Sequence, residues 1–335
     1  MYLLPRPQEM LLQDNVFYVD YTAEICIDPE ASPEWLHYAS LLQKEIEQDT
    51  GFHLNINRNL PVFQTPSILL KSTSGHSQQE YTLRIRESGI LLTASSNSGM
   101  LYAIQTLRQI IRQEGACLPG LDIHDFPVIS NRGLYYDVTR SRIPTLSYLK
   151  KMADTLSFYK INQLHLYIEH TYMFRNLSEV WRDDTPLTSS DILELDRYCA
   201  DLGIELVPSI ASFGHLYKIL RTKSFRHLCE REDLCEEPFG FIDRMEHHTI
   251  DVSNEESFSF IWSLIEEYLP LFRSDKFNIC GDETFDLGTG KSHELAEREG
   301  TQQLYIQYIK KLCDALVTHG KTPMFWGDIE CSVSY

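Results

Sequence analysis

The sequence predicts an α/β protein in which a small α+β domain precedes a catalytic domain of the (β/α)8 TIM-barrel type. Residues 1–127 contain segments typical of strand, helix, three strands and helix. Residues 128–335 alternate strand-like and helix-like segments, and the strands are apolar, which is typical of a parallel sheet covered by helices. A stretch containing two prolines, at 115–131, predicts a linker between the two patterns.

In the first domain, side chains of alternating character predict a strand at 16–28. A helix is expected over 33–48, because apolar residues recur there every three or four positions and a proline opens the first turn. A second helix is expected over 99–112 for the same periodic reason. Three strands are expected between the two helices, with a glycine turn before the last, at 67–71, 81–86 and 90–94.

In the second domain we expect five strands, at 133–138, 163–168, 204–209, 277–280 and 324–326. Helices are expected between them, at 146–160, 191–202, 255–271 and 301–319. A closed barrel needs eight strands. The sequence therefore predicts either a barrel truncated after its fifth strand or an open sheet of another type.

Composition excludes some classes of partner. The chain has 335 residues, and 30 lysines and arginines against 48 aspartates and glutamates give a net charge of −18. Nucleic acid and anionic membrane are therefore not expected as partners, because binding phosphate needs a basic surface.

No apolar run approaches the roughly 18 residues of a membrane span, and the first residues do not have the pattern of a signal peptide. Eight cysteines without a C-x-x-C pair fit a reduced, cytoplasmic protein. The oligomeric state is left open.

The most informative motif is the segment at 277–283, where an apolar strand runs into a glycine and then into Asp282 and Glu283. In parallel α/β folds the chemistry lies at the carboxyl ends of the strands. Two close carboxylates resist double ionisation, which suits one of them to act as a general acid. The alternative is a solvated acid pair in a loop. Other polar residues also follow strands: Asp137 and Arg140 follow the first strand, and Glu169 and His170 the second.

Five motifs in order resemble the family 20 glycoside hydrolases, the β-N-acetylhexosaminidases. They are Asp125-Phe-Pro127, Arg132-Gly133, Gly214-His215, Gly281-Asp282-Glu283 and Lys321-Thr-Pro-Met-Phe-Trp326. The resemblance covers nearly the whole chain. It implies that residues 1–127 are the non-catalytic N-terminal domain of the family and that residues 128–335 are its barrel, with strands one to five.

The resemblance implies exo-acting hydrolysis of terminal, non-reducing β-linked N-acetylglucosamine or N-acetylgalactosamine. The family retains configuration without an enzyme nucleophile, because the 2-acetamido oxygen of the substrate attacks C1 and forms an oxazolinium ion. Glu283 matches the general acid/base. Asp282 matches the residue that orients the acetamido N–H and stabilises its developing charge. No cofactor and no metal is implied, and the expected partner is an N-acetylhexosamine-containing oligosaccharide or glycoconjugate.

Four further residues are carried over from the family. Arg132 matches the residue that binds sugar hydroxyls, Trp326 a wall of the acetamide pocket, and His215 the histidine beside the acid/base. The family pattern is broken at the second strand, which carries Leu166-Tyr167 and His170-Thr171 in place of Trp-His and Asp-Asp. Glu169 is expected to replace part of the lost charge.

Two other classes of function stay open from the residues alone. One is a catalytically silent carbohydrate-binding or scaffold protein, which missing barrel strands would favour. The other is a metal-dependent barrel hydrolase, with a zinc site drawn from His215, His227 and His247-His248. No H-E-x-x-H spacing supports that site.

Overall fold

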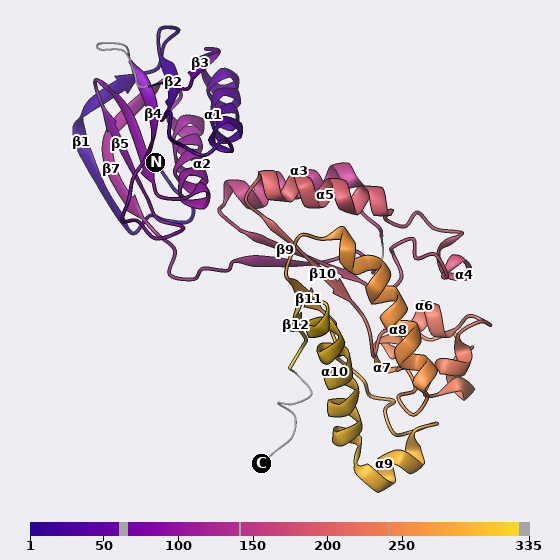
Figure 1. Ribbon diagram of the computed structural model, residues 1–335. Helices are drawn as coiled ribbons and strands as arrows, with labels where there is room; N and C mark the ends of the chain where they lie inside the picture. Colours follow the sequence, from indigo (N-terminus) through magenta and orange to yellow (C-terminus); the bar gives the residue numbers. More distant parts are fainter. Residues whose placement is uncertain (60–65, 141, 241, 328–335) are drawn as a thin grey trace. The chain divides into compact units, whose positions relative to one another are not determined.

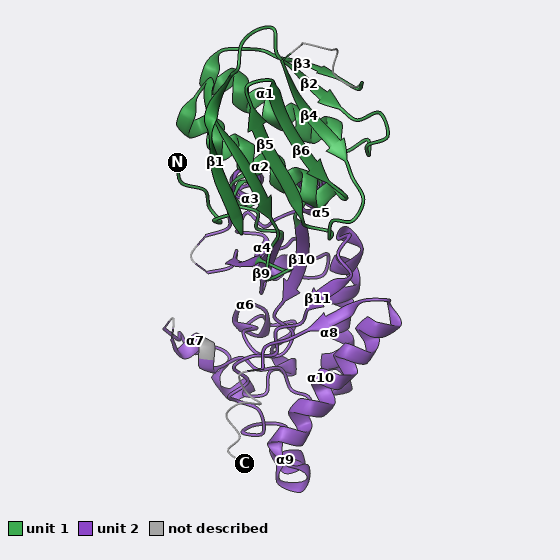
Figure 2. Cartoon of the chain, turned by 90° about the vertical axis from the view of Figure 1, so that its left-hand side faces the viewer, with its two compact units in different colours: residues 1–132, 153–162, 201–204 green, residues 133–152, 163–200, 205–335 purple. Residues whose placement is uncertain are grey.

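The computed structural model describes residues 1–335 apart from 60–65, 141, 241 and 328–335 (Figure 1). The chain divides into two compact units (Figure 2). The first unit comprises residues 1–132, 153–162 and 201–204, and the second comprises 133–152, 163–200 and 205–335. No described helix is long and apolar enough to cross a lipid bilayer.

The first unit is built on a mixed seven-stranded sheet in the order β1-β7-β5-β6-β4-β2-β3. Its strands are β1 (Glu9–Tyr18), β2 (Glu24–Ile27), β3 (Asn55–Asn57), β4 (Ser67–Ser72), β5 (Tyr81–Arg86), β6 (Gly89–Ala94) and β7 (Cys117–Asp125). Helices α1 (Trp35–Thr50) and α2 (Asn97–Glu114) pack together, and α2 also packs on the sheet. Leu42 and Ile104 of the helices and Leu83 of the sheet are fully buried in the shared core. The expected α+β domain is confirmed, with both helices and the β5–β6 hairpin in place.

Two expectations for this unit were wrong. The segment expected as one strand at 16–28 is the end of β1, a turn, and β2. The expected linker contains β7, which pairs antiparallel with both β1 and β5. Pro119 is tolerated because it lies beside the irregularity that shifts the register of β1. Gly120 leaves room for the Asn15 side chain, whose Oδ1 would lie 2.4 Å from an added Cβ. Pro119 and Gly120 therefore mark a strand with an irregular partner opposite it.

The second unit is built on a parallel five-stranded sheet in the order β12-β11-β10-β9-β8. Its strands are β8 (Gly133–Asp137), β9 (Gln163–Ile168), β10 (Glu205–Ile210), β11 (Lys276–Asn278) and β12 (Thr322–Met324). The longer helices that alternate with them along the chain are α3 (Leu146–Phe158), α5 (Ser189–Asp201), α8 (Glu255–Tyr268) and α10 (Thr301–Thr318). This is the β/α alternation expected of a (β/α)8-type domain. All five expected strands are present, although β12 covers Thr322–Met324 rather than 324–326.

Shorter elements lie in the loops that follow the strands, except for η3, which directly follows α8. They are α4 (Ser178–Trp181), α6 (Tyr217–Leu220), α7 (Asp243–Glu246), α9 (His293–Glu299) and the 3-10 turns η1 (Arg226–Leu228), η2 (Glu232–Leu234) and η3 (Leu269–Leu271). Strand β9 is buried along its whole length, as the central strands of a parallel sheet are. Because all five strands run the same way, the loops after β8, β9, β10, β11 and β12 meet at one edge of the sheet.

Candidate active site

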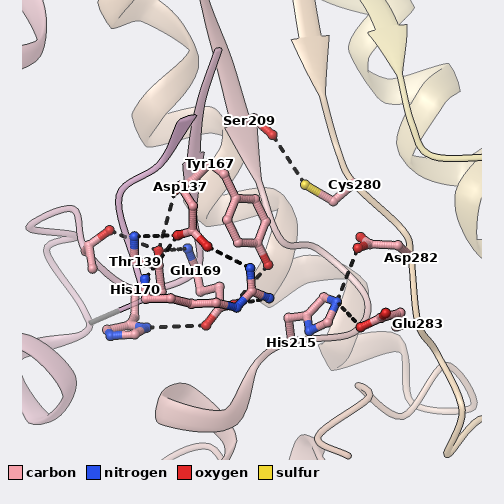
Figure 3. Close-up of polar contacts among 12 residues, drawn as sticks. Asp137, Thr139, Tyr167, Glu169, His170, Ser209, His215, Cys280, Asp282 and Glu283 are labelled. Carbon is pink, nitrogen blue, oxygen red and sulfur yellow. Dashed lines mark hydrogen bonds and ion pairs between the residues drawn. The ribbon is translucent and has the colours of Figure 1, made fainter. Parts of the chain in front are cut away.

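The acid pair lies in a sharp turn directly after β11. Cys280, Gly281 and Glu283 all adopt positive φ values, of 60°, 82° and 47°. The chain therefore leaves the strand geometry in which neighbouring side chains point to opposite faces. Gly281 suits this turn because its φ of 82° strains other residues, and an added Cβ would also lie 2.8 Å from Cδ1 of Ile309, so that side chain would have to shift. The turn brings Asp282 and Glu283 to the same neighbour, His215 (Figure 3).

His215 joins the two carboxylates. It follows β10, has a φ of 61°, and is only 3% exposed. Its Nε2–H donates to Oδ2 of Asp282 at 3.2 Å, and the same nitrogen lies 3.3 Å from Oε2 of Glu283. Burial lowers the pKa of His215, but the hydrogen bond and charge of Asp282, with the charge of Glu169, raise that pKa by more, so the net shift is upward. The surroundings therefore favour an imidazolium that bridges the two acids.

The two carboxylates differ in how they are available to a ligand. Oδ1 of Asp282 is buried and has no hydrogen-bond partner among the residues that the structure describes. The side chain of Glu283 is 36% exposed, so it can reach both a ligand and water. A buried acceptor without a donor costs free energy unless a ligand satisfies it. The pair thus offers one fixed acceptor and one accessible acid.

A second polar cluster lies at the ends of β8 and β9. Oε1 of Glu169 accepts a hydrogen bond from the Tyr167 hydroxyl at 2.9 Å and lies 3.2 Å from Nη2 of Arg140. Nη1 of Arg140 donates to Oδ2 of Asp137 at 2.8 Å. Burial raises the pKa of Glu169, and the charges of Arg140 and His215 offset only part of that rise. Glu169 therefore lies in this cluster beside Arg140, in surroundings that on balance disfavour its charged form.

The structure does not bring Arg132 to this cluster. Arg132 directly precedes the amino end of β8, whereas the other site residues follow carboxyl ends. Its guanidinium donates hydrogen bonds, at 2.6–3.1 Å, to the carbonyl groups of Lys160, Ile129 and Ser130, to Gln79 and to Tyr102. These partners use every nitrogen of the guanidinium, so the expected sugar contact does not fit its placement. Arg140 lies instead beyond the carboxyl end of β8, a position that its place just after the predicted strand indicated.

Trp326 follows β12, and its side chain is partly exposed to solvent. Its backbone N–H donates to the carbonyl of Cys280 at 2.9 Å, which fixes it beside the turn that carries the acid pair. One edge of the indole packs against Tyr135 of β8, with ring centroids 4.9 Å apart at 77°. The residue is 39% exposed, so an aromatic surface is left for a ligand.

The histidines considered for zinc are dispersed. His215 contacts the acid pair, His227 lies 3.1 Å from Glu256, and His247 lies 2.9 Å from Asp286. Within the described part of the chain, no three or more His, Cys, Asp or Glu side chains are grouped to hold a metal ion. The metal-dependent alternative therefore has no candidate site among those residues.

A cavity of about 330 Å³ adjoins the two clusters. His215, Arg140 and Glu169 all contribute to its wall. Small-molecule sites typically measure roughly 300–1,000 Å³. The cavity is therefore large enough to hold part of a sugar-sized ligand beside the acid pair.

Comparisons with known proteins agree with the resemblance in the sequence. A family model described as "Glycosyl hydrolase family 20, catalytic domain" matches residues 130–334, and one described as "Glycosyl hydrolase family 20, domain 2" matches residues 1–126. Among curated proteins, the chain is 24% identical to a β-hexosaminidase of Porphyromonas gingivalis, covering 98% of this chain and 45% of the relative. It is 26% identical to a β-hexosaminidase of Akkermansia muciniphila, covering 91% and 62%. The chain thus spans about half the length of the curated relatives it matches.

Solved structures share the fold. The chitobiase of Flavobacterium johnsoniae superposes with a TM-score of 0.80 at 21% identity, covering 99% of this chain and 53% of that one. An exo-β-N-acetylglucosaminidase of Vibrio harveyi gives 0.82 at 22% identity, covering 99% and 56%. At these identities the likeness establishes the fold alone, and it confirms the barrel-type domain preceded by an α+β domain.

Proposed function

Because the chain belongs to glycosyl hydrolase family 20, we propose that it removes terminal, non-reducing β-linked N-acetylhexosamine from an oligosaccharide or glycoconjugate. Residues 128–335 carry the reaction in this proposal, and residues 1–127 do not. The observation that carries it is the acid pair, in which His215 holds Asp282 and Glu283 at the carboxyl edge of a parallel sheet.

Glu283 is the general acid and then the general base. In the first step its proton passes to the glycosidic oxygen while the bond from that oxygen to C1 breaks. In the second step the carboxylate takes a proton from water, and the water oxygen bonds to C1 while the bond between C1 and the acetamido oxygen breaks, which restores the acetamido group. The partial exposure of Glu283 supports this role, because the same group must reach both the leaving oxygen and a water molecule.

Asp282 positions the internal nucleophile. The acetamido oxygen of the substrate bonds to C1 as the leaving group departs, which gives the oxazolinium ion and places positive charge on the acetamido nitrogen. The unpartnered Oδ1 of Asp282 is suited to accept the acetamido N–H and to stabilise that charge. His215 occupies the other oxygen, Oδ2, and so fixes the carboxylate plane.

Arg140 takes the place proposed from the sequence for Arg132. Its guanidinium lies at the carboxyl edge, paired with Asp137 and Glu169, and lines the cavity beside His215. A planar guanidinium with further N–H groups suits binding of sugar hydroxyls. Trp326 is proposed to form one wall of the acetamide pocket through its exposed surface.

A reducing compartment, the cytoplasm, is the proposed location. Seven cysteines in the described part of the chain are free thiols, and five of them are buried. Buried free cysteines behave as small apolar side chains and are usual where thiols are kept reduced.

The test is turnover of 4-nitrophenyl N-acetyl-β-D-glucosaminide by the 335-residue chain and by any longer natural form. General acid–base catalysis contributes about 10²–10⁴-fold, so Glu283→Gln is expected to lower kcat by about that factor with an unchanged melting temperature. Glu294→Gln, an exposed position on α9, makes the same chemical change away from the site and is the control. Equal turnover by Glu283→Gln and the control would contradict the assignment.

A further inference from the structure

The cavity beside His215 has a basic wall in an acidic protein. Its charged lining residues are the cations Arg140, Arg142, Lys218 and Arg244 and the carboxylates Glu169 and Asp184. The whole chain carries a net charge of −18. A cavity with more cations than carboxylates therefore runs against the charge of the protein around it.

Not all of this positive charge is neutralised by the lining. Arg140 is paired with Glu169 at 3.2 Å and with Asp137. Lys218 is exposed and makes no ion pair with any residue that the structure describes. Arg142 lies over the ring of Tyr148 at 5.4 Å and likewise has no carboxylate within 4 Å among those residues.

The other polar residues of the lining do not cancel its excess of positive charge. Burial, together with the charge of Lys218, lowers the pKa of His170 to about 4, so this lining residue is neutral near pH 7. Arg244 lies over the ring of Tyr217, another lining residue, at 5.0 Å. At physiological ionic strength, exposed charges are screened beyond about 8 Å. The local cations, rather than the distant acidic surface, therefore set the potential that a ligand in the cavity meets.

We propose that this cavity binds an anionic substituent of the substrate, so that the preferred substrate is an acidic N-acetylhexosaminide. The substituent is an oxyanion: a sulfate ester, a phosphate ester or a carboxylate. His215 supports this arrangement, since it contacts both acids and also lines the cavity. A sugar bound at Asp282 and Glu283 can then direct an oxyanion toward Lys218 and Arg142. Guanidinium and ammonium groups form strong charge-assisted hydrogen bonds with such oxyanions. This inference rests on the proposed hydrolase function.

The test is calorimetric titration of the 335-residue chain with N-acetylglucosamine and with three acidic forms, its 6-sulfate, its 6-phosphate and N-acetylmuramic acid. Inorganic sulfate is titrated separately. At least one acidic sugar is expected to bind about tenfold more tightly than the neutral sugar, a preference that falls as salt screens the charges. The three acidic sugars distinguish sulfate, phosphate and carboxylate as the source of the oxyanion.

The variants make the test specific. Lys218→Gln and Arg142→Gln are each expected to reduce the preference for the acidic sugar about fivefold. Lys223→Gln removes the same charge from an exposed position that does not line the cavity and is expected to leave the preference intact. Equal affinity for neutral and acidic sugars, or an equal effect of Lys223→Gln, would overturn the inference.

Different outcomes would contradict the anion site and the proposed hydrolase function. Hydrolysis of the uncharged aryl glycoside without any preference for acidic sugars would overturn the inference and leave the function standing. Binding of inorganic sulfate that is lost in Lys218→Gln, with no hydrolysis of any glycoside, would support the anion site and contradict the hydrolase function.

Discussion

Gly214 packs against the backbone of the acid pair, so adding a methyl group at this residue tests whether that packing positions the two acids. An added Cβ at this residue would lie 2.7 Å from the carbonyl oxygen of Asp282 and 3.1 Å from that of Glu283. Ordinary contact begins at 3.4 Å, so Gly214→Ala requires the two segments to separate by about 0.7 Å. Both atoms belong to the backbone, which cannot swing aside as a side chain does.

The two segments are also fastened to each other. Oγ of Ser212 donates to the carbonyl of Ile279 at 2.6 Å, and the hydroxyl of Tyr308 on α10 donates to the carbonyl of Ser212 at 3.2 Å, which ties the segment of Gly214 to that helix as well. The separation must therefore strain these bonds or displace the acid pair. Overpacking of this kind costs about 1–3 kcal/mol, and a misplacement of about 1 Å at reacting groups can cost about 100-fold in rate. We expect Gly214→Ala to lower kcat by about 30- to 100-fold and to lower the free energy of unfolding by about 1–3 kcal/mol.

The assay is turnover of the aryl glycoside, with urea unfolding of the same preparations. Gly300→Ala is the matched control, since Gly300 has a φ of 90° but no atom within 4 Å of an added Cβ. We expect the control to lose about 1 kcal/mol of stability from backbone strain and to keep its kcat. A kcat for Gly214→Ala within twofold of the unmodified chain would refute the view that this packing positions the acids.

The remaining predictions concern His215 and the two arginines. The pKa of His215 is raised in the folded protein, so its protonated form stabilises the fold below about pH 6.5, and this contribution is lost as the pH rises through the raised pKa. In urea unfolding we expect His215→Gln to be most destabilising near pH 6 and less so near pH 9; the same difference at both pH values would count against the bridge. Arg140→Gln is expected to lower kcat/KM at least about tenfold, through lost contacts with sugar hydroxyls. Arg132→Gln is expected to lower stability by about 1–3 kcal/mol and to keep kcat/KM, and the reverse pattern would restore the assignment made from the sequence.

Much of the fold could be predicted because its signals are periodic. The predicted alternation of apolar strands and amphipathic helices after residue 133 is found in the strands of the parallel sheet and in the helices between them. Strand β7 could not be predicted in this way, since Pro119 and Gly120 are turn residues in most contexts. Their tolerance depends on an irregular partner strand and on the Asn15 side chain, which only the pairing reveals.

The site was predictable only in part. The position of Asp282 and Glu283 at a strand end indicated a catalytic role. Their common contact with His215 depends on the positive φ values of the turn after β11, which cannot be predicted from the residue types. Arg132 and Arg140 flank the same strand, and a motif match alone favoured Arg132, at the amino end, over Arg140, beyond the carboxyl end. The basic cavity combines Arg142, from the loop after β8, with Lys218 of α6 and Arg244 of α7, so no linear pattern could have predicted it.

The central claim is that the acid pair directs attack by the substrate's own acetamido group. The most direct measurement is inhibition of aryl N-acetylglucosaminide turnover by a thiazoline mimic of the oxazolinium ion, on the 335-residue chain and on any longer natural form. We expect competitive inhibition with an affinity at least about 100-fold above that of N-acetylglucosamine, because an analogue of the reacting state binds more tightly than product. Asp282→Asn is expected to lose most of that advantage. Turnover that the thiazoline does not inhibit, or absence of turnover from both forms, would contradict the account.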